Sequence, residues 1–367
     1  QSYMVLDIST RRNLELTESI RSQERKGSLL WLLDRTGTAM GGRMLKKWVQ
    51  QPLVDKAGID ARLDAVEALI EKDEVLSILA ETLKEVYDLE RLMGRIAYGT
   101  ANGRDLIALK TSLRQLPSIR ALTGEMGAGL LQTYHDEIDE LTDIADLIES
   151  SIREDCPLTI REGGVIKEEW NEELDRYRKA MGEGKQWIAE LEKKERERTG
   201  IKNLKVGFNK VFGYYLDVTK SNYELVPEEY VRKQTLANSE RYITQELKEM
   251  EDTILGAEEK SLRLEYRLFT EIRDTINESI GRIQTTAEAL ASLDALVSFA
   301  RVSQKNGYVR PGIRVDGVLS IKSGRHPVVE RTLPNEQFVP NDTELDLDKS
   351  RFMILTGPNM AGKSTYM

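Results

Sequence analysis

Residues 170–219 read WNEELDRYRKAMGEGKQWIAELEKKERERTGIKNLKVGFNKVFGYYLDVT, and the spacing of their apolar side chains changes along the stretch. Apolar or small residues recur in steps of four and three at Trp170, Leu174, Tyr177, Met181, Gly184, Ile188 and Leu191. This spacing predicts a helix with a heptad seam, in which Gly184 leaves room for a partner to approach closely. A charge-rich run then leads to Gly200, which favours a helix stop.

The residues after Gly200 favour a small antiparallel sheet. Apolar and polar residues alternate over residues 204–209 and again over residues 214–219, with a turn near Asn209–Lys210. Alternation on both sides of a short turn predicts two paired strands. The aromatic side chains of this segment could stack on nucleic-acid bases. In so small a sheet we expect them to form the core instead; they are Phe208, Phe212, Tyr214 and Tyr215.

A long stretch with helical spacing follows, from about Leu236 to Ser303. Residues 243–257 continue the steps of four and three between apolar side chains. Further along, one apolar residue falls every seven positions, at Phe269, Ile276, Ile283, Leu290 and Val297. The pattern predicts a long returning helix that Gly256 or Gly281 could divide. Antiparallel pairing with the preceding helix would bury both seams and hold the β module several nanometres from the core.

The remaining segments lie on either side of this predicted arm. Residues 1–150 have helical spacing and predict a helical core, whose glycine-rich breaks lie at Gly41–Gly42, Gly99–Gly103 and Gly124–Gly129. After about residue 305 the sequence shows short β signals, at Val318–Ile321, Val328–Val329 and Phe352–Leu355. Some of these strands would lead into a nucleotide-binding motif at the end of the sequence.

We therefore expect a mainly α protein with a helical core, long antiparallel helices, an inserted small β module and the truncated start of an α/β domain. The expected segments are 1–191 for the core and first long helix, 192–242 for the β module, 243–304 for the returning helix and 305–367 for the start of the α/β domain.

Residues 357–364, GPNMAGKS, match the phosphate-binding pattern G-x-x-x-x-G-K-[ST]. The glycines let backbone N–H groups turn toward the phosphates, and Lys363 supplies an ammonium for the β- and γ-phosphates. The Ser364 hydroxyl would ligate Mg²⁺, so the motif indicates ATP and Mg²⁺ as ligands of the parent protein. Because the sequence stops at Met367, we expect this chain neither to hydrolyse ATP nor to bind it well.

The β module is the second candidate site. Residues 192–242 contain eleven Lys and Arg against eight Asp and Glu, a balance of +3, while the whole chain has a formal charge of −9. A basic module on an acidic protein is typical of a reader of the phosphate backbone. The alternative is a solvated surface whose small excess of positive charge has no function. The candidate DNA contacts are Lys205, Asn209, Lys210, Arg232, Lys233 and Asn238.

Composition excludes several other classes of protein. The single cysteine, Cys156, excludes a disulfide framework and indicates a reducing compartment. With only His135 and His326, an ordinary zinc site is excluded. No apolar run approaches the ~20 residues that cross a bilayer, so no membrane partner is expected. No signal segment opens the chain, and both ends look like cuts within a longer protein.

Residues 356–367, TGPNMAGKSTYM, closely resemble the nucleotide-loop signature of the MutS family of bacterial DNA mismatch-repair ATPases. Asn359-Met360 within the loop is more specific than the generic pattern. Further stretches resemble the family in the same order, and they are Thr10–Leu16, Gly27–Trp31, Thr38–Arg43, Leu204–Asn209, Gly213–Tyr215, Gln234–Leu236, Glu240–Tyr242 and Gly324–Val328. The resemblance covers essentially the whole chain.

The resemblance implies a core-and-lever domain split by an inserted clamp, followed by an ABC-type ATPase domain. It implies that Phe338 stacks on adenine and that ATP lies against Gly357, Pro358, Asn359, Met360, Ala361, Gly362, Lys363, Ser364 and Thr365. It further implies that the clamp grips the backbone of double-stranded DNA and that the lever helices couple this grip to the ATP state. A homodimer around DNA, a MutL partner and a place in the bacterial cytoplasm at the nucleoid follow from the same resemblance.

Parts of the family pattern are missing from this sequence. The mismatch-reading and connector domains, the acidic metal strand and the main dimerisation surface are absent, so we expect any DNA binding to be weak, steeply salt-dependent and indifferent to mismatches. Three other readings remain: a MutS paralogue in recombination control, a coiled-coil arm like those of SMC chromosome proteins, and a purely scaffolding module.

Overall fold

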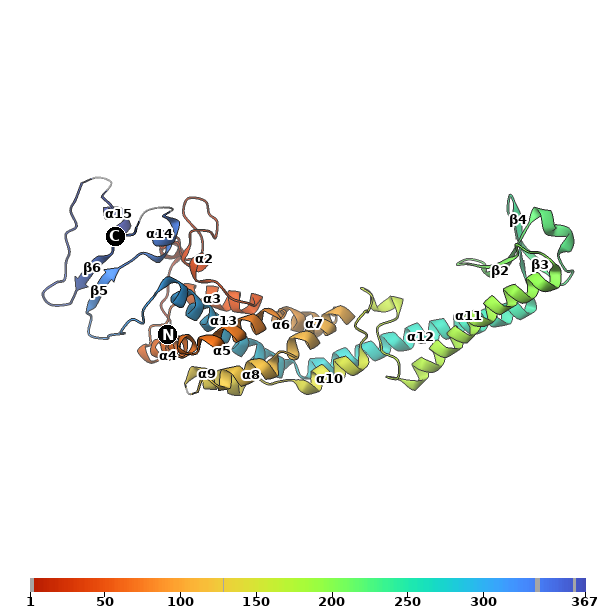
Figure 1. Cartoon of the computed structure of the whole chain (residues 1–367), viewed down its shortest axis with the longest axis horizontal. Coiled ribbons are helices and arrows are strands. Elements are labelled where there is room, and N and C mark those ends of the chain that lie inside the picture. The colour runs from red at the N-terminus through yellow and green to blue at the C-terminus, as the bar shows by residue number, and fades with distance from the viewer. Residues whose placement is uncertain (1–2, 128, 334–336, 359–360) are drawn as a thin grey trace. The chain divides into compact units, whose positions relative to one another are not determined.

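The computed structural model describes residues 3–127, 129–333, 337–358 and 361–367. The described part of the chain divides into two compact units. Unit 1 comprises residues 1–94, 111–142 and 279–367, and unit 2 comprises residues 95–110 and 143–278. Figure 1 shows the chain with its elements labelled.

Helices dominate the first 151 residues. They are α1 Ile8–Asn13, α2 Leu29–Leu33, α3 Ala39–Gln50, α4 Lys56–Glu71, α5 Asp73–Lys84, α6 Leu89–Ala97, α7 Gly103–Leu113, α8 Leu116–Gly124, α9 Leu130–Glu137 and α10 Thr142–Ser151. The expected breaks between α6 and α7 and between α8 and α9 are confirmed. The break expected at Gly41–Gly42 is wrong, because both glycines lie inside α3.

A buried carboxylate explains why glycine lies within α3. Asp294, on helix α13 (Ile280–Asn306), accepts hydrogen bonds from the backbone N–H groups of Gly37 and Thr38 and from the Thr38 hydroxyl. The Thr38 hydroxyl in turn caps α3 by accepting from the Gly41 N–H at 2.9 Å. A Cβ atom on Gly41 would lie 2.1 Å from the Asp294 carboxylate, so a larger residue does not fit there.

Helix α13 is the central helix of unit 1. It is apolar around most of its circumference, as expected of a helix enclosed on all sides. Leu290 and Val297 of the predicted seven-residue repeat are buried, and Ala295 packs with Leu45 and Leu30 in one hydrophobic cluster. Trp48 and Phe299 stack beside that cluster, with ring centroids 6.2 Å apart.

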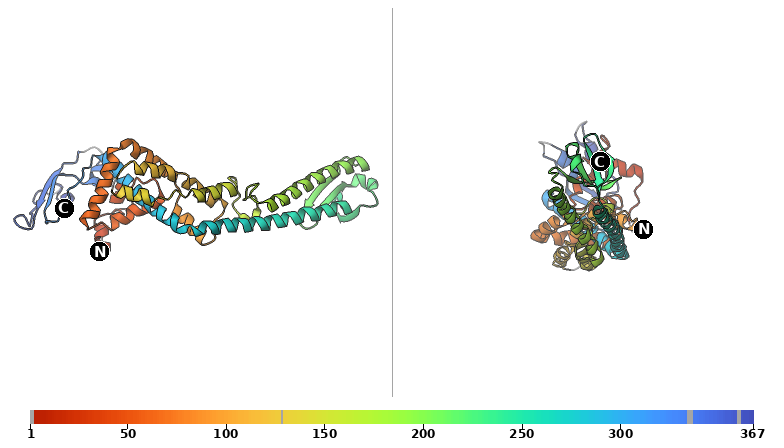
Figure 2. Two further views of the ribbon diagram at one scale, coloured as in Figure 1. Left: turned by 90° about the horizontal axis from the view of Figure 1, so that it is seen from below. Right: turned by 90° about the vertical axis from the view of Figure 1, so that its right-hand side faces the viewer.

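Unit 2 contains the paired helices α11, Glu172–Thr199, and α12, Gln245–Glu278. Asn171 caps the start of α11 and Gly200 ends it in the left-handed conformation, which confirms the predicted stop. Contacts run in opposite directions along the two helices, since Arg178 bonds Glu265 whereas Lys194 pairs with Glu246. The two helices lie side by side in Figures 1 and 2. Antiparallel pairing is therefore confirmed within this unit.

Gly184 is the point of close approach between these helices. A Cβ atom there would lie 2.4 Å from Cγ1 of Ile254, which is buried on α12. The seam of α11 begins at Leu174, because Trp170 precedes the helix and is partly exposed. The expected use of a small residue at the seam is confirmed.

The long returning stretch starts later than predicted and is divided into two helices. It begins at Gln245 and not at Leu236, because residues 231–235 and 239–243 form a second pair of strands. α12 ends at Glu278 and α13 begins at Ile280, so the break lies at Ser279, close to Gly281. Gly256 lies inside α12 and breaks nothing.

The inserted sheet has four strands in the order β1-β2-β4-β3, all antiparallel. The strands are β1 Lys205–Asn209, β2 Gly213–Thr219, β3 Val231–Thr235 and β4 Ser239–Ile243, and the 3-10 segments are η1 Ile160–Glu162 and η2 Lys220–Leu225. The predicted β1–β2 hairpin is confirmed, with Asn209 opposite Gly213. The β3–β4 hairpin is an addition to the prediction.

The last segment of unit 1 contains β5 Leu319–Gly324, α14 Pro327–Thr332, β6 Asn341–Leu345 and α15 Lys363–Tyr366. β5 and β6 form an antiparallel pair, which confirms the β signal near Val318–Ile321. Val328–Val329 are helical, because His326 caps α14 through its Nδ1. Residues 352–355 form no strand, and Phe352 is 83% exposed, since no described strand lies alongside them. In the described part of the chain no helix is long and apolar enough to span a membrane.

Candidate nucleic-acid interface and nucleotide loop

The inserted sheet and the helix pair share one hydrophobic core. Ile188 and Leu191 of α11, Leu216 and Val218 of β2, and Leu247 of α12 are buried in the same cluster. Tyr230 and Tyr242 join it from the second hairpin. The sheet is thus fixed to the ends of α11 and α12 by packing, and not by a flexible tether.

The register divides the sheet into two faces. Val206, opposite Leu216, points to the core side, and Phe208 follows on that side opposite Tyr214. Lys205, opposite Asp217, and Gly207, opposite Tyr215, belong to the other face. This second face is polar and carries the first of the predicted DNA contacts.

Four of the eight acidic side chains of residues 192–242 pair with cations of the module, and they are Glu192, Glu195, Glu229 and Glu240. Glu195 is only 4% exposed and is bonded by the Tyr230 hydroxyl and by Arg198. Arg198 also pairs with Glu229, and this double pairing raises the pKa of Arg198. Glu192 accepts from the Val206 N–H and from Arg196. Half of the acidic side chains are therefore paired internally, whereas the other four form no ion pair within the described part of the module.

Several lysines of the module, in contrast, have no acidic partner among the described residues. Lys205, Lys210, Lys202 and Lys220 are all exposed and take part in no ion pair there. Lys205 lies on the polar face of β1, and Lys210 lies in the turn that follows β1. These lysines can therefore meet phosphates without first breaking an ion pair, while the net charge of residues 192–242 stays +3.

Three of the other four predicted DNA contacts already form bonds within the module. Asn209 accepts from the Val211 and Phe212 N–H groups with its side-chain oxygen, at 2.8 and 3.3 Å, so that oxygen is used in the turn. Lys233 donates to the Phe212 carbonyl, which brings the β3 bulge to the same turn. Arg232 pairs with Glu240 at 3.4 Å. Asn238 is exposed in the β3–β4 turn.

The aromatic residues do not all form core as expected. Tyr214 packs against the shared core, but Phe208 is 48% exposed and Phe212 is 38% exposed. Phe208 lies against Tyr214 with ring centroids 4.8 Å apart. The core prediction is wrong for the two phenylalanines, because β1 is an edge strand and the turn extends beyond the helices.

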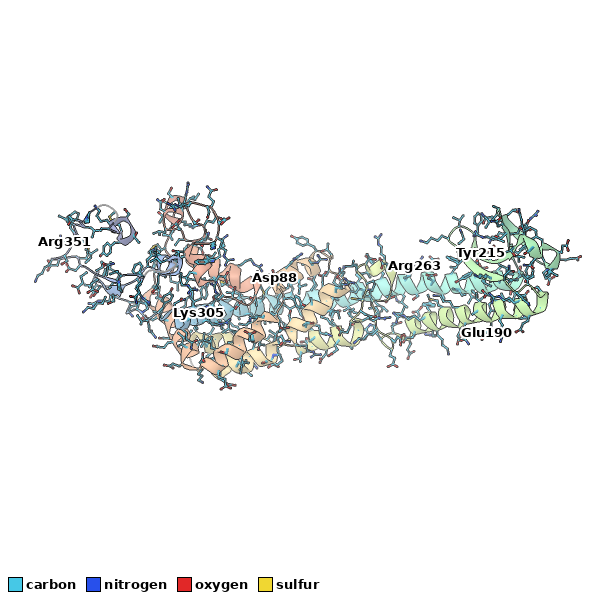
Figure 3. The ribbon with its side chains drawn as sticks, turned by 45° about the horizontal axis from the view of Figure 1, so that its top comes forward. Asp88, Glu190, Tyr215, Arg263, Lys305 and Arg351 are labelled. Atoms are coloured by element: carbon cyan, nitrogen blue, oxygen red, sulfur yellow. The ribbon has the colours of Figure 1, made fainter. Side chains whose placement is uncertain are left out.

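Two polar contacts of this sheet have no clear signal in the sequence. Arg241 lies over the Tyr215 ring at 4.1 Å and donates to Gln234, and Tyr215 itself covers Gly207 (Tyr215 is labelled in Figure 3). Glu251 of α12 accepts from the Tyr214 N–H and fills the space beside Gly213. The family resemblance at Glu240–Tyr242 is the only sequence signal near Arg241.

The nucleotide loop is described except for Asn359 and Met360, which lie outside the described residues. Gly362 adopts the left-handed conformation with φ of 86°, and α15 begins at the next residue. The Lys363 ammonium donates to the Gly357 carbonyl at 2.6 Å, so it folds over the loop. Ser364 and Thr365 are exposed in the first turn of α15.

A cavity of about 970 Å³ lies beside this loop. Phe338 lines it together with Gly357, Gly362 and Lys363. The structure thus brings the predicted adenine contact and the phosphate loop to one cavity, although they are far apart in sequence. His326, at the same cavity, caps helix α14. The described residues contain no cluster of acidic, His or Cys side chains suited to a metal ion.

The chain is similar to known proteins over its whole length. The family model described as MutS domain III matches residues 9–300. Proteins called DNA mismatch repair protein MutS from Acetivibrio thermocellus and Ruminiclostridium cellulolyticum are 55% and 56% identical over 367 residues, which is all of this chain and 42% of each relative. The protein of that name from Clostridium perfringens is 50% identical and is covered over 40% of its length.

The chain therefore spans about two-fifths of the length of these relatives, and the identity extends without interruption from the helical core through the inserted sheet to the nucleotide loop. Such identity over the whole chain is not expected of an unrelated coiled-coil arm. This chain belongs to the MutS family of DNA mismatch repair proteins, and most of it corresponds to that family's domain III.

Proposed function

We propose that the inserted four-stranded sheet is a clamp that contacts the backbone of double-stranded DNA without reading sequence. The observation that carries this proposal is that Lys205 and Lys210 are exposed and form no ion pair among the described residues, whereas Glu195 and Glu192 are paired within the module. Unpaired cations on a fixed surface attract phosphates and release counterions on binding. Lys233, Arg232, Asn238 and the amide N–H groups of the Asn209 side chain complete the proposed contact.

The nucleotide loop would bind ATP and Mg²⁺ in the whole protein. Lys363 would exchange the Gly357 carbonyl for the β- and γ-phosphates, the Ser364 hydroxyl would ligate Mg²⁺, and Phe338 would stack on adenine. The remaining loop residues, Pro358 to Ala361 and Thr365, would surround the phosphates.

The α11–α12 pair and α13 would act as levers between the two sites in the whole protein. In this proposal the ATP state shifts the lever helices, and the sheet follows because it shares their core. The wide separation of residues 204–219 from residues 351–363, and the domain boundaries at residues 191, 242 and 304, stay predictions. A homodimer around DNA and a MutL partner rest on the family resemblance.

Double-stranded DNA binding at several salt concentrations tests the clamp proposal. Fluorescence anisotropy with a labelled duplex should give a non-specific Kd of about 10⁻⁴–10⁻⁶ M at moderate salt. The double variant Lys205→Glu/Lys210→Glu should bind more weakly and lower the slope of log K against log salt by about 1.8. Matched and mismatched duplexes should be affected equally.

The control is Lys185→Glu/Lys260→Glu, which makes the same charge change on exposed lysines of α11 and α12 outside residues 192–242. This control should bind nearly as well as the unmodified chain. Equal losses in both double variants would show that net charge alone attracts DNA. A preference of the unmodified chain for mismatched duplex would contradict the proposal that the clamp reads only backbone.

A role in recombination control, as in some paralogues, is the second candidate. The relatives that match this chain from end to end carry the mismatch-repair name, which favours the first proposal.

A further inference from the structure

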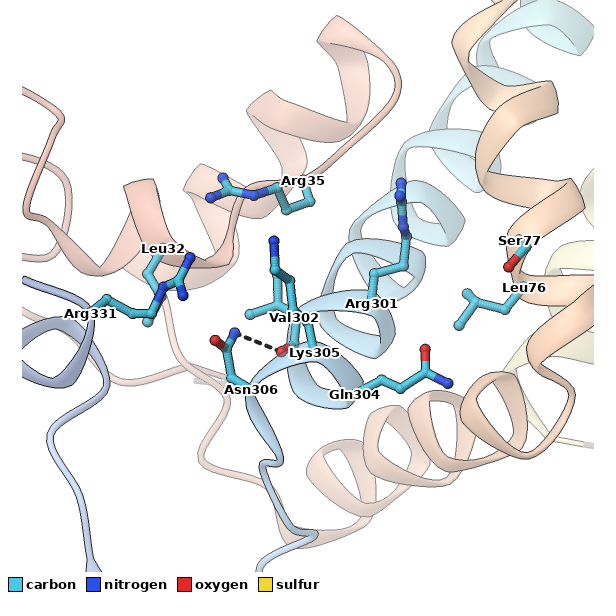
Figure 4. Close-up of a pocket in the computed structure, with 10 residues that line it drawn as sticks. All are labelled: Leu32, Arg35, Leu76, Ser77, Arg301, Val302, Gln304, Lys305, Asn306 and Arg331. Atoms are coloured by element: carbon cyan, nitrogen blue, oxygen red, sulfur yellow. Dashed lines mark hydrogen bonds between the residues drawn. The ribbon is translucent and has the colours of Figure 1, made fainter. Parts of the chain in front are cut away.

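A cationic cavity of about 360 Å³ lies in unit 1, apart from the nucleotide loop (Figure 4). Four basic side chains line it: Arg35 after α2, Arg301 and Lys305 on α13, and Arg331 on α14. In the view of Figure 4 the Lys305 side chain lies between those of Arg331 and Arg301, with Arg35 above it. Among the described residues, no acidic side chain lines this cavity.

The floor of the cavity is apolar. Leu32, Leu76 and Val302 line it and are buried, with 1–3% of each residue exposed. Of the four cations, Arg301 is half-buried, whereas Arg35, Lys305 and Arg331 are exposed to solvent. The volume lies at the lower end of the range of about 300–1,000 Å³ that is typical of small-molecule pockets. The cavity can therefore hold a small anion close to several cations.

The acids nearest to these cations are engaged elsewhere. Asp34 pairs with Arg25, and Glu81 pairs with Lys84. Asp73 accepts from the Gln304 amide, whereas Glu330 pairs with Arg325. Arg301, Lys305 and Arg331 form no ion pair within the described ranges. Arg35 donates to the carbonyls of Trp31 and Asp34. The pKa of Glu81 is lowered mainly by Lys84, and the charge of Arg301 also helps to lower it. The four cations nevertheless form no ion pair with an acid of the described residues.

Stabilisation of the α13 C-terminus is the simplest structural reason for such cations, but that end is already capped. Arg325 donates to the carbonyls of Asn306 and Gly307 at 3.4 and 3.2 Å. The Asn306 amide donates to the Val302 carbonyl, and the Tyr308 N–H donates to the Ser303 carbonyl. Arg301 and Lys305 bond none of these groups, so capping does not account for them.

We propose that this cavity binds a phosphate oxyanion, either free pyrophosphate or the phosphate tail of a nucleotide. Guanidinium and ammonium groups bind phosphate through charge-assisted hydrogen bonds, and Arg offers two parallel donors to it. An anion here would join α2, the end of α13 and α14, and would offset the mutual repulsion of the four cations. This site is separate from the loop at Lys363, and it does not depend on the proposed DNA contact.

Isothermal titration of the full 367-residue chain with pyrophosphate, without Mg²⁺, tests the proposal. The unmodified chain should show saturable binding that weakens as salt is raised. Arg301→Gln/Lys305→Gln should weaken that binding about thirtyfold, which corresponds to about 2 kcal/mol. The exchange Arg301→Lys/Lys305→Arg keeps both charges and should retain most of the affinity, which guards against a general loss of folding.

Two further variants identify where the anion binds. Lys26→Gln, which removes an exposed lysine outside the cavity, should leave pyrophosphate binding unchanged. Lys363→Ala removes any weak phosphate binding at the nucleotide loop, and the saturable binding that depends on Arg301 and Lys305 should remain. Loss of binding in Lys363→Ala would assign the anion to the loop and overturn the proposal. So would absence of saturable binding, or equal affinity in the unmodified chain and Arg301→Gln/Lys305→Gln. Titration with AMP, ADP and ATP then separates pyrophosphate from a nucleotide tail.

Discussion

The close packing of α11 on α12 can be tested with two glycines of the same helix. Gly184 faces α12, and a Cβ atom there would lie 2.4 Å from Cγ1 and 2.8 Å from Cδ1 of Ile254. Gly182 lies two residues earlier, and a Cβ atom there would meet nothing within 4 Å. Changing each glycine to alanine adds the same methyl group to the same helix in two different surroundings.

The two substitutions should change the free energy of unfolding in opposite directions. Gly182→Ala should stabilise unit 2 by about 1 kcal/mol, because alanine is the better helix former. Gly184→Ala gains the same propensity but overfills a closely packed seam, which typically costs about 1–3 kcal/mol. Ile254 is buried and cannot swing into solvent. The Gly184 variant should therefore be about 1–3 kcal/mol less stable than the Gly182 variant.

Hydrogen exchange over residues 172–199, followed by mass spectrometry, measures the opening free energy of this helix separately from unit 1. A double-mutant cycle with Ile254→Ala should show that the two changes at the seam are coupled, since truncating Ile254 makes room for the new methyl group. If Gly184→Ala protects the helix as well as Gly182→Ala does, the two helices do not approach each other closely at Gly184.

Three more predictions concern unit 1. Gly41→Ala should destabilise it by more than about 2 kcal/mol, because the new Cβ would overlap the Asp294 carboxylate. Gly94→Ala, with open space around the new methyl group, should not destabilise it, and urea denaturation measures both variants. Burial raises the pKa of Asp294 from 3.8, so its contribution to stability is greatest below that value and is lost as the pH rises through the raised pKa; Asp294→Asn should flatten this part of the pH–stability curve. Calorimetric titration with Mg-ATP should show only weak binding, and micromolar affinity would contradict the expectation that this chain does not bind ATP well.

The helix pair and the first hairpin can be predicted from sequence because the segments that pack together each show a regular spacing of apolar residues. The seam of α11, the repeat through Phe269 and Ile276, and the β1–β2 hairpin all depend on local alternation of apolar residues. The β3–β4 hairpin gives no such signal, because VRKQT and SERYI are dominated by polar and charged residues, and only Tyr242 of these strands is buried. Its stability comes from pairing with β2, which no local pattern reports.

Contacts between distant residues limit the prediction of the sites. From the sequence alone, Gly41 resembles a helix break. The reason for this glycine is its contact with Asp294, which lies 253 positions later in the sequence and is linked to it by no local pattern. Likewise, the charges in residues 192–242 can be counted from the sequence, but Glu195 finds Tyr230 only in the folded module. Which lysines stay unpaired is therefore decided by tertiary structure, whereas their presence is visible in the sequence.

Buried contacts at two places make the helix pair and its sheet move as one body. At one place, Glu265 of α12, only 2% exposed, accepts from the N–H groups of Gly164, Val165 and Ile166 and from Arg178 of α11. Separating the helices there would leave a buried carboxylate and several donors without partners, at a cost of about 3–5 kcal/mol. At the other, Leu247 and Ile254 share the hydrophobic core of the sheet. Because neither place can open without losing buried contacts, a displacement of the sheet by DNA must displace α11 and α12 with it, as the proposed lever requires.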